Sequence, residues 1–277
     1  MSSKPPHFNK TRIAPTPSGF LHVGNVLSFA ITTALAQKTG TKVLLRIDDM
    51  DQTRADARYI QHIFDTLNFL EISWDEGPRN AQEFEESYSQ IHRLELYNQT
   101  IKTLYNEGLI YGCACSRKQL ATQSCTCFTK RLDPDTPDVS WRLKTDSNLI
   151  LNIRDHSGKT IQATLPAEME NFIVKRRDGL PAYQLTSVVD DLYYGIDLVV
   201  RGQDLWASTV AQHYLALVLG EQKFSGISFY HHTLLLEPDG KKLSKSAGAT
   251  SIKYMQEQGK TATDVFGIIA DMLGITG

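Results

Sequence analysis

Pro15-Thr-Pro-Ser-Gly-Phe-Leu-His-Val-Gly-Asn25 is the stretch of sequence that decides the fold. Residues 10–14, just before it, are typical of a short strand, and residues 25–38, which follow, carry apolar side chains at helical spacing. Residues 42–47 form a short apolar run suited to a buried parallel strand. Strand, helix and strand at this spacing predict a βαβ unit with a right-handed crossover.

The rest of the chain departs from this α/β pattern and then returns to it. Between residues 111 and 165 the predicted elements are short strands, which is typical of a smaller inserted module. Asp178-Gly179 separates two further predicted strands and is a strong signal for a hairpin. We predict helices over residues 56–67, 87–107, 206–219 and 262–273, and strands over 140–144, 149–154, 160–165, 172–177, 180–185 and 196–200.

The expected architecture is α/β: a Rossmann-like domain with a parallel sheet, split by a small insertion and followed by a short C-terminal helical stem. A chain of 277 residues is long enough to bury a core of this kind. The expected boundaries are residues 9–110 and 176–232 for the two halves of the main domain, 111–175 for the insertion, and 233–277 for the stem.

The composition is that of an ordinary globular protein. Hydrophobic residues make up 41% of the chain and charged residues 22%, and the formal net charge is −2. This balance argues against a protein that coats nucleic acid, although a local basic patch is sufficient to bind RNA. Two such patches are Lys175-Arg176-Arg177 and Lys241-Lys242 with Lys245, for which a solvated surface is the alternative. No apolar run has the length of a membrane span, and the first ten residues lack a signal-peptide core, so we expect a cytoplasmic protein without a membrane partner.

The loop of the deciding stretch is suited to binding an anion. Backbone N–H groups and the helix dipole face a ligand where a strand passes through a Gly/Pro-rich loop into a helix. Pro15, Pro17 and Gly19 shape this loop, Gly24 permits close approach of a nucleotide, and His22 can donate to a phosphate oxygen in a transition state. A single His at a helix start is more often structural than catalytic, so this motif alone is a weak signal.

A second motif, Lys242-Leu-Ser-Lys-Ser246, makes ATP the expected ligand. Gly240 and Ser244 give this segment flexibility, and the ammonium groups of Lys242 and Lys245 can hold a triphosphate for in-line attack on its α-phosphate. A Lys/Ser segment alone is usually a surface feature, but the two motifs in this order are far more specific than either one.

Together the two motifs resemble the paired ATP-binding signatures of class I aminoacyl-tRNA synthetases, and nearly the whole chain resembles the catalytic core of glutamyl-tRNA synthetases. The stretches that carry this resemblance are Arg12-Ile-Ala-Pro-Thr-Pro-Ser-Gly19, Leu45-Arg-Ile-Asp-Asp-Met-Asp51, Trp74-Asp-Glu-Gly-Pro78, Val188-Val-Asp-Asp191, Arg201-Gly-Gln-Asp204 and Lys242-Leu-Ser-Lys-Ser246. Residues 201–209 look closer to the glutamyl-queuosine tRNA(Asp) synthetase branch, and only residues 247–277 follow the second motif. The resemblance therefore implies a catalytic domain without an anticodon-binding domain.

The resemblance also assigns roles to individual residues. The guanidinium groups of Arg12 and Arg201 suit a substrate with two carboxylates, because arginine pairs bidentately with carboxylate; the alternative for both is a surface salt bridge. Asp48 stands where the family has a longer acid that meets the α-ammonium group, and this is a departure from the family pattern. The implied glutamate-binding residues are Arg12, Ala14, Thr16, Asp48, Tyr183 and Arg201; the implied ATP-binding residues are Pro15, Ser18, Gly19, His22, Gly24, Asn25, Lys242, Ser244 and Lys245; and the implied catalytic residues are His22, Lys242 and Lys245.

All four cysteines of the chain, Cys113, Cys115, Cys125 and Cys127, fall within one short segment of the predicted insertion. Four thiolates can hold a tetrahedral Zn²⁺, and a cytosolic chain with cysteines only here is not expected to form disulfides. The Cys-x-Cys spacing is tighter than the usual knuckle, so buried or free cysteines are the alternative. Related enzymes carry a zinc in this insertion, and its role here would be structural.

The expected activity is activation of glutamate with ATP and Mg²⁺, followed by transfer of glutamate to queuosine at the wobble position of tRNA(Asp). The expected partners are glutamate and the queuosine-bearing anticodon arm of tRNA(Asp), and the protein is expected to be a monomer. One alternative is a glutamyl-tRNA synthetase core that acts at the acceptor end. Another is a non-catalytic module that uses the same fold to bind RNA.

Overall fold

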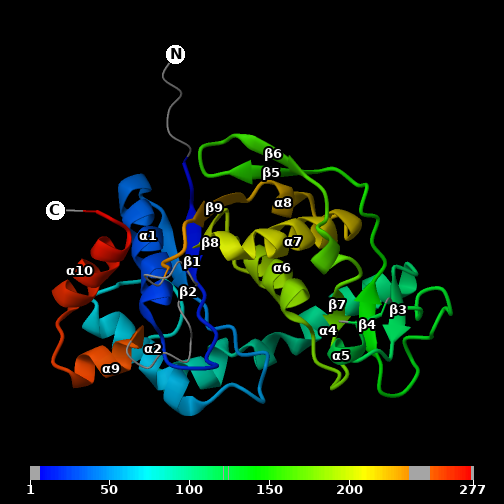
Figure 1. Cartoon of the computed structure of the whole chain (residues 1–277), viewed down its shortest axis with the longest axis horizontal. Helices are drawn as coiled ribbons and strands as arrows, with labels where there is room; N and C mark the ends of the chain where they lie inside the picture. Colours follow the sequence, from blue (N-terminus) through cyan, green and yellow to red (C-terminus); the bar gives the residue numbers. More distant parts are fainter. Residues whose placement is uncertain (1–6, 121, 124, 237–249, 276–277) are drawn as a thin grey trace.

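The computed structural model describes residues 7–120, 122–123, 125–236 and 250–275 (Figure 1). The second motif, with Lys242, Ser244 and Lys245, lies outside these residues, so its role stays a prediction. The helices are α1 (Val23–Thr39), α2 (Ala57–Phe69), α3 (Ala81–Glu83), α4 (Leu94–Asn106), α5 (Arg117–Leu120), α6 (Tyr183–Tyr193), α7 (Trp206–Val218), α8 (Gln222–Ser225), α9 (Ile252–Glu257) and α10 (Ala262–Met272). The strands are β1 (Lys10–Ile13), β2 (Lys42–Leu45), β3 (Ile110–Cys113), β4 (Ser140–Leu143), β5 (Leu151–Asp155), β6 (Thr160–Ala163), β7 (Ile173–Lys175), β8 (Leu198–Gly202) and β9 (Ser228–His232).

The predicted βαβ unit is confirmed by β1, α1 and β2. The two strands pair in parallel, with Lys10 opposite Lys42. α1 begins two residues earlier than the apolar spacing predicts, because His22 caps it in an extended conformation. The helix ends at Gly40, which adopts the left-handed conformation with φ 71° that glycine accommodates without strain.

The second sheet has the order β6-β5-β9-β8 and is mixed rather than purely parallel. β9 pairs in parallel with β5 and with β8, whereas β6 runs antiparallel to β5. β1 packs beside β8, and the Asp197 N–H donates to the Lys10 carbonyl over 3.1 Å at the start of both strands. The carboxyl ends of β1 and β8 therefore come together, which is where α/β sheets bind their ligands.

The third sheet, β3-β4-β7, is antiparallel and lies at the right of Figure 1, beside α5. It belongs to the segment 111–175 that the sequence predicts as an insertion. Residues 151–163 of the same segment form β5 and β6, which instead extend the sheet of β8 and β9. The boundaries of the insertion stay a prediction.

The predicted hairpin over residues 172–185 is wrong in its second arm. The turn is present, with Gly179 at φ 82° and the Arg176 N–H donating to Leu180 O over 2.8 Å. Pro181 makes only one bridge, to Lys175, and has no N–H for a ladder. α6 starts two residues later, at Tyr183.

The single helix predicted over residues 87–107 is also wrong in its first third. A π-helical turn (Phe84–Tyr88) and a 3-10 turn (Gln90–Arg93) come before α4. The polar side chains of Gln90 and Arg93 are buried on the inner side of this segment, where they bind Asp190. These buried contacts hold the segment out of a regular helix.

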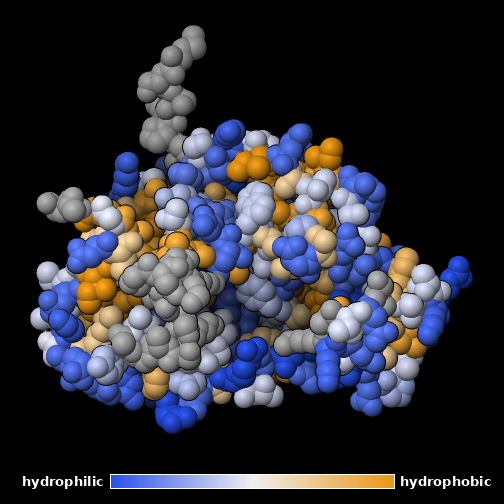
Figure 2. Space-filling model, in the orientation of Figure 1, coloured by the Kyte–Doolittle hydropathy of each residue, from blue (hydrophilic) through white to orange (hydrophobic). Residues whose placement is uncertain are grey.

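The two largest groups of buried apolar side chains lie one among α1, α2, α9 and α10 and the other among α4, α6, α7 and β9, and two smaller groups accompany them. In Figure 1 the first group of helices lies at the left and α6, α7 and α8 lie towards the right, with β1, β8 and β9 between them. Hydrophilic residues cover most of the face in Figure 2, and smaller apolar groups are scattered among them. Among the described residues, no helix combines the length and the hydropathy needed to cross a membrane.

Candidate active site

A cavity of about 660 Å³ opens at the carboxyl ends of β1 and β8. It is lined by every predicted glutamate-binding and ATP-binding residue that the structure describes: Arg12, Ala14, Pro15, Thr16, Ser18, Gly19, His22, Gly24, Asn25, Asp48, Tyr183 and Arg201. These side chains come from β1, the loop after it, the start of α1, the loop after β2, the start of α6 and the end of β8. Segments that are far apart in sequence thus meet at one cavity, which also receives Thr250 and Ser251 from the chain after the second motif.

One end of the cavity is the N-terminus of α1. His22 Nδ1 accepts from the Gly24 N–H over 3.1 Å, and Asn25 Oδ1 accepts from the His22 N–H over the same distance. Because Nδ1 is an acceptor, the proton of a neutral His22 ring sits on Nε2. A Cβ on Gly24 would lie 3.0 Å from the His22 ring, so glycine here keeps the ring in its capping position.

The other end of the cavity holds the charged residues. Arg12 Nε donates to Asp191 Oδ1 over 3.2 Å, and Arg46 Nη1 donates to the same oxygen over 2.6 Å. Arg46 also donates two hydrogen bonds to Asp48, from Nε to Oδ1 over 2.7 Å and from Nη2 to Oδ2 over 3.1 Å. All four side chains are at least nine-tenths buried, so the surface salt bridge considered for Arg12 is wrong.

Arg201 is a buried cation with only neutral hydrogen-bond partners. Its Nη2 donates to Thr209 Oγ1 over 2.5 Å and to Gln212 Oε1 over 3.0 Å, and its Nε has no partner among the described residues. Burial lowers the pKa of Arg201 to about 10, and the charge of Arg12 contributes in the same direction. No described carboxylate lies within ion-pairing distance of it, so the surface salt bridge is wrong here too. A buried charge of this kind is stabilised when an anion binds beside it.

Asp48 faces Arg46 rather than open space. Burial raises the pKa of Asp48, and the Arg46 guanidinium opposes that rise. The carboxylate is therefore held in one orientation by a two-point contact. Asp48 lines the cavity wall with a reach one methylene shorter than that of glutamate, and its contact to a substrate ammonium group stays a prediction.

Several residues at the site were not predicted. Arg46 and Asp191 lie in stretches that carry the family resemblance. Their ion pair joins residues 145 positions apart, so no local sequence pattern predicts it. Ser28, one turn beyond Gly24 on α1, also lines the cavity, and its Oγ lies 2.6 Å from His232 Nε2 of β9. Helical spacing could have placed Ser28 there, whereas His232 depends on the sheet order.

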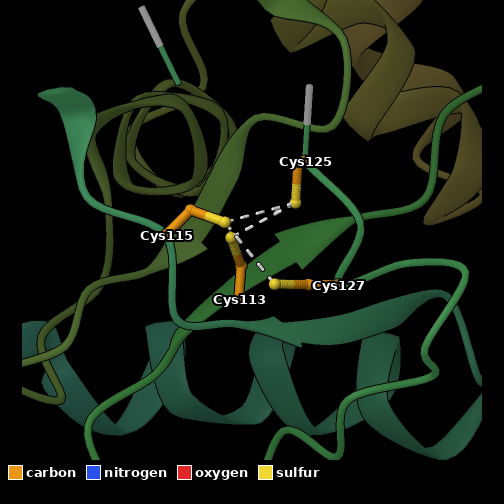
Figure 3. Close-up of side chains that lie close together, drawn as sticks. All are labelled: Cys113, Cys115, Cys125 and Cys127. Atoms are coloured by element: carbon orange, nitrogen blue, oxygen red, sulfur yellow. Dashed lines mark hydrogen bonds between the residues drawn. The ribbon is translucent and has the colours of Figure 1, made fainter. Parts of the chain in front are cut away.

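The four predicted metal ligands come together in a second site (Figure 3), and none of them lines the cavity. Their Sγ atoms all lie within 4.8 Å of one another, and three pairs are separated by 3.6 to 3.8 Å. A tetrahedral zinc with Zn–S bonds of about 2.3 Å needs Sγ atoms about 3.8 Å apart. Cys113, Cys115, Cys125 and Cys127 therefore fit a zinc ion, and four thiolates leave no open position on it.

Residues 9–138 and 128–276 match the family described as tRNA synthetases class I (E and Q), catalytic domain. The chain belongs to this family. As a class I tRNA synthetase it is a ligase, not the non-catalytic module that the sequence left open.

Two relatives of this synthetase are named glutamyl-Q tRNA(Asp) synthetase. The one from Symbiobacterium thermophilum is 34% identical over 95% of this chain and 86% of its own length. The one from Pseudomonas putida is 36% identical over 88% of this chain and 79% of its own length. A third relative, glutamate–tRNA ligase 2 of Syntrophus aciditrophicus, is 31% identical over 93% of this chain, which spans 55% of that protein.

The solved structure of a glutamate tRNA ligase from Elizabethkingia meningosepticum has the same fold. It aligns with a TM-score of 0.66 at 22% identity, over 87% of this synthetase and 52% of the ligase.

Proposed function

We propose that this synthetase activates glutamate with ATP and Mg²⁺ and transfers it to queuosine at the wobble position of tRNA(Asp). The observation that carries the first half is the buried guanidinium of Arg201, which has no anionic partner among the described residues. A substrate carboxylate would supply that partner. Arg12, whose guanidinium lines the same cavity, would hold the second carboxylate of glutamate.

The other end of the cavity supports a nucleotide. The start of α1 offers backbone N–H groups and the positive end of the helix dipole, as phosphate sites do. His22 would donate from Nε2 to a phosphate oxygen, because its Nδ1 accepts from the Gly24 N–H. Lys242 and Lys245, assigned from the family motif, would add positive charge at the triphosphate, and Mg²⁺ would neutralise the departing pyrophosphate.

The proposed reaction has two steps. A carboxylate oxygen of the substrate attacks the α-phosphorus in line, a new O–P bond forms, and the bond to pyrophosphate breaks. A hydroxyl of the acceptor then attacks the carbonyl carbon of glutamyl-adenylate, and AMP leaves. The cavity needs no protein nucleophile for either step, because the substrates provide both; its residues orient the substrates and stabilise charge.

The choice of acceptor rests on the relatives. Those named glutamyl-Q tRNA(Asp) synthetase match this chain over most of their own length, which favours queuosine. The glutamate–tRNA ligase from Syntrophus supports the alternative, transfer to the 3′ end of a tRNA. Labelled glutamate, ATP and tRNA(Asp) with and without queuosine would distinguish the two. We expect label only on the queuosine-containing tRNA, retained after the 3′-terminal adenosine is removed; equal labelling of both, lost with that adenosine, would contradict the proposal.

The remaining proposals concern the cofactor and the assembly. Zinc at the four cysteines would be structural, and atomic absorption of the purified protein should give one zinc per chain. We further propose a cytoplasmic monomer whose inserted module, residues 111–175, contacts the tRNA.

A further inference from the structure

The basic run Lys175-Arg176-Arg177 lies between the cysteine cluster and the cavity. On sequence it is either an RNA-binding patch or a solvated surface, but each side chain has a defined contact within the protein. Lys175 Nζ lies 4.1 Å from the centre of the Trp141 ring. Arg176 and Arg177 point to two different parts of the molecule, and these two contacts lead to the inference.

Arg177 holds the cysteine cluster. Its Nη2 donates to the carbonyl of Ala114, the residue between the first two cysteines. Cys115, the next residue, has its Sγ 3.6 Å from Cys127 Sγ in the second half of the cluster. Arg177 therefore holds the peptide group that leads into Cys115, and Cys115 in turn lies against a cysteine of the second half.

Arg176 holds the loop that follows β2. Its Nη1 lies 3.1 Å from Asp51 Oδ1, and Asp51 is three residues beyond Asp48 in the cavity wall. The middle of this loop is anchored from the other side, because Asp49 Oδ1 accepts from the Gln90 N–H over 2.8 Å. Thr53 and Arg54 bind Asp51 from within the loop, so Arg176, which also pairs with Asp178 of its own turn, is the contact that joins Asp51 to the turn.

The chain just after the same turn contributes a side chain to the cavity. The Ala182 N–H donates to Val174 O over 3.0 Å, which braces the chain on both sides of the turn. Tyr183 follows at once as the first residue of α6, and its side chain lines the cavity. A shift of the turn would move Tyr183 and the anchor of Asp51 together.

We propose that Arg176 and Arg177 are positioning residues that couple the cysteine cluster to the amino-acid end of the cavity. An ordered, zinc-loaded cluster fixes Arg177; the turn then fixes Arg176 and Tyr183; and these fix the loop that carries Asp48. Arg177 is exposed and the Arg176 side chain is 28% exposed, and ion pairs that water reaches in this way contribute little to folding. Their loss should therefore change the binding of the amino acid more than the stability of the protein. The inference rests on the proposed function in two respects, the zinc at the cysteines and the naming of that amino acid as glutamate.

The first test measures hydrogen exchange of the full chain, with zinc bound and after its removal by a chelator. In the wild type, zinc removal should speed exchange in residues 111–127 and also in 49–54. In Arg177→Gln and in Arg176→Gln, zinc removal should still speed exchange in residues 111–127. It should no longer change exchange in residues 49–54. Lys130→Gln, an exposed change in the same insertion, is the matched control and should behave as the wild type.

The second test measures glutamate-dependent pyrophosphate exchange in the zinc-loaded proteins. Arg177→Gln and Arg176→Gln should raise KM for glutamate about fivefold, at the lower end of coupling between sites, with kcat and KM for ATP unchanged. Arg177→Lys retains a donor and should restore most of the affinity.

The inference is overturned if the wild type binds no zinc, if zinc removal leaves exchange of residues 49–54 unchanged, or if Arg177→Gln keeps the wild-type response. An absence of glutamate activation would overturn the proposed function instead, because the hydrogen-exchange result does not depend on the substrate. Equal thermal stability of the variants and the control shows that the change is not a loss of folding.

Discussion

Arg93 and Arg201 are both buried arginines beside α6, yet their surroundings differ. Arg93 donates to both oxygens of Asp190, over 2.8 and 3.2 Å, and that ion pair raises its pKa although burial acts to lower it. Arg201 has only hydroxyl and amide partners, and burial lowers its pKa to about 10. A buried cation in a hydrogen-bonded ion pair holds the fold together, whereas one at a cavity with no carboxylate in hydrogen-bonding distance is available to a ligand.

The largest expected effect comes from removing Arg201. Arg201→Met should lower kcat/KM for glutamate by about 100-fold or more, because truncating one partner of a buried charge pair costs roughly 2–5 kcal/mol of binding. Pyrophosphate exchange at several glutamate concentrations measures this. The free energy of unfolding of the free protein should fall less than when an ion pair is broken, since no described carboxylate is hydrogen-bonded to Arg201 and its charge acts on Asp191 only at longer range.

Arg93→Met should show the opposite pattern. It removes the cation that binds both oxygens of Asp190 and leaves only Arg46, whose Nε lies 4.0 Å from Asp190 Oδ2, which costs about 3–5 kcal/mol of stability. Urea unfolding measures this loss, and the Arg201→Met protein serves as its control. If the two variants lost equal stability, the distinction between a structural and a ligand-binding arginine would be refuted.

A smaller effect is expected when Asp48 is lengthened. Asp48→Glu restores the reach that the family pattern has at this position, and it should lower KM for glutamate by about fivefold, the value of one net hydrogen bond. Asp48→Asn, which keeps the length but loses the charge, should raise KM. If the Asp48→Glu protein had a higher KM, the site would instead require the two hydrogen bonds that Arg46 makes to the shorter acid.

The smallest effect concerns acid stability. Burial lowers the pKa of His213 and of His231 to about 4 from an ordinary value of 6.5, and the charge of Arg201 adds to both shifts. The unfolded chain binds these protons first as the pH falls, so their contribution to stability is complete above about pH 6.5 and is lost between pH 6.5 and 4. Each histidine should add a slope of about 1.4 kcal/mol per pH unit in that window. His213→Phe should remove one such slope in urea unfolding at several pH values, and an unchanged slope would contradict the assignment.

Sequence patterns over a few residues predict the elements whose stabilising contacts lie close together in the chain. The βαβ unit, α7 and α10 follow from apolar spacing and short connections, and the cysteines meet because they are close in sequence. The strand predicted over residues 180–185 overlaps the start of α6, because Leu180-Pro-Ala-Tyr183 is typical of extended chain and gives no sign of the helix that begins at Tyr183.

The residues of the site also fall into those that a local sequence pattern predicts and those that it does not. The loop and helix start around His22 are visible in sequence because their chemistry is contiguous. The roles of Arg12, Asp48, Tyr183 and Arg201 came from family resemblance rather than from spacing. Arg46 and Asp191 were missed because their ion pair forms only when α6 packs beside β2, and no pattern over a few residues encodes such a contact.

A single oxygen atom, Asp191 Oδ1, accepts hydrogen bonds from both Arg12 and Arg46. Arg12, Arg46 and Asp191 should therefore be substituted together in natural variants, because replacing one of them leaves the other two as buried charges without their partner. Laboratory evolution of the amino-acid pocket should meet the same constraint. Libraries that randomise Arg12 alone would return inactive proteins, whereas libraries that vary all three positions together would reach pockets of a different charge.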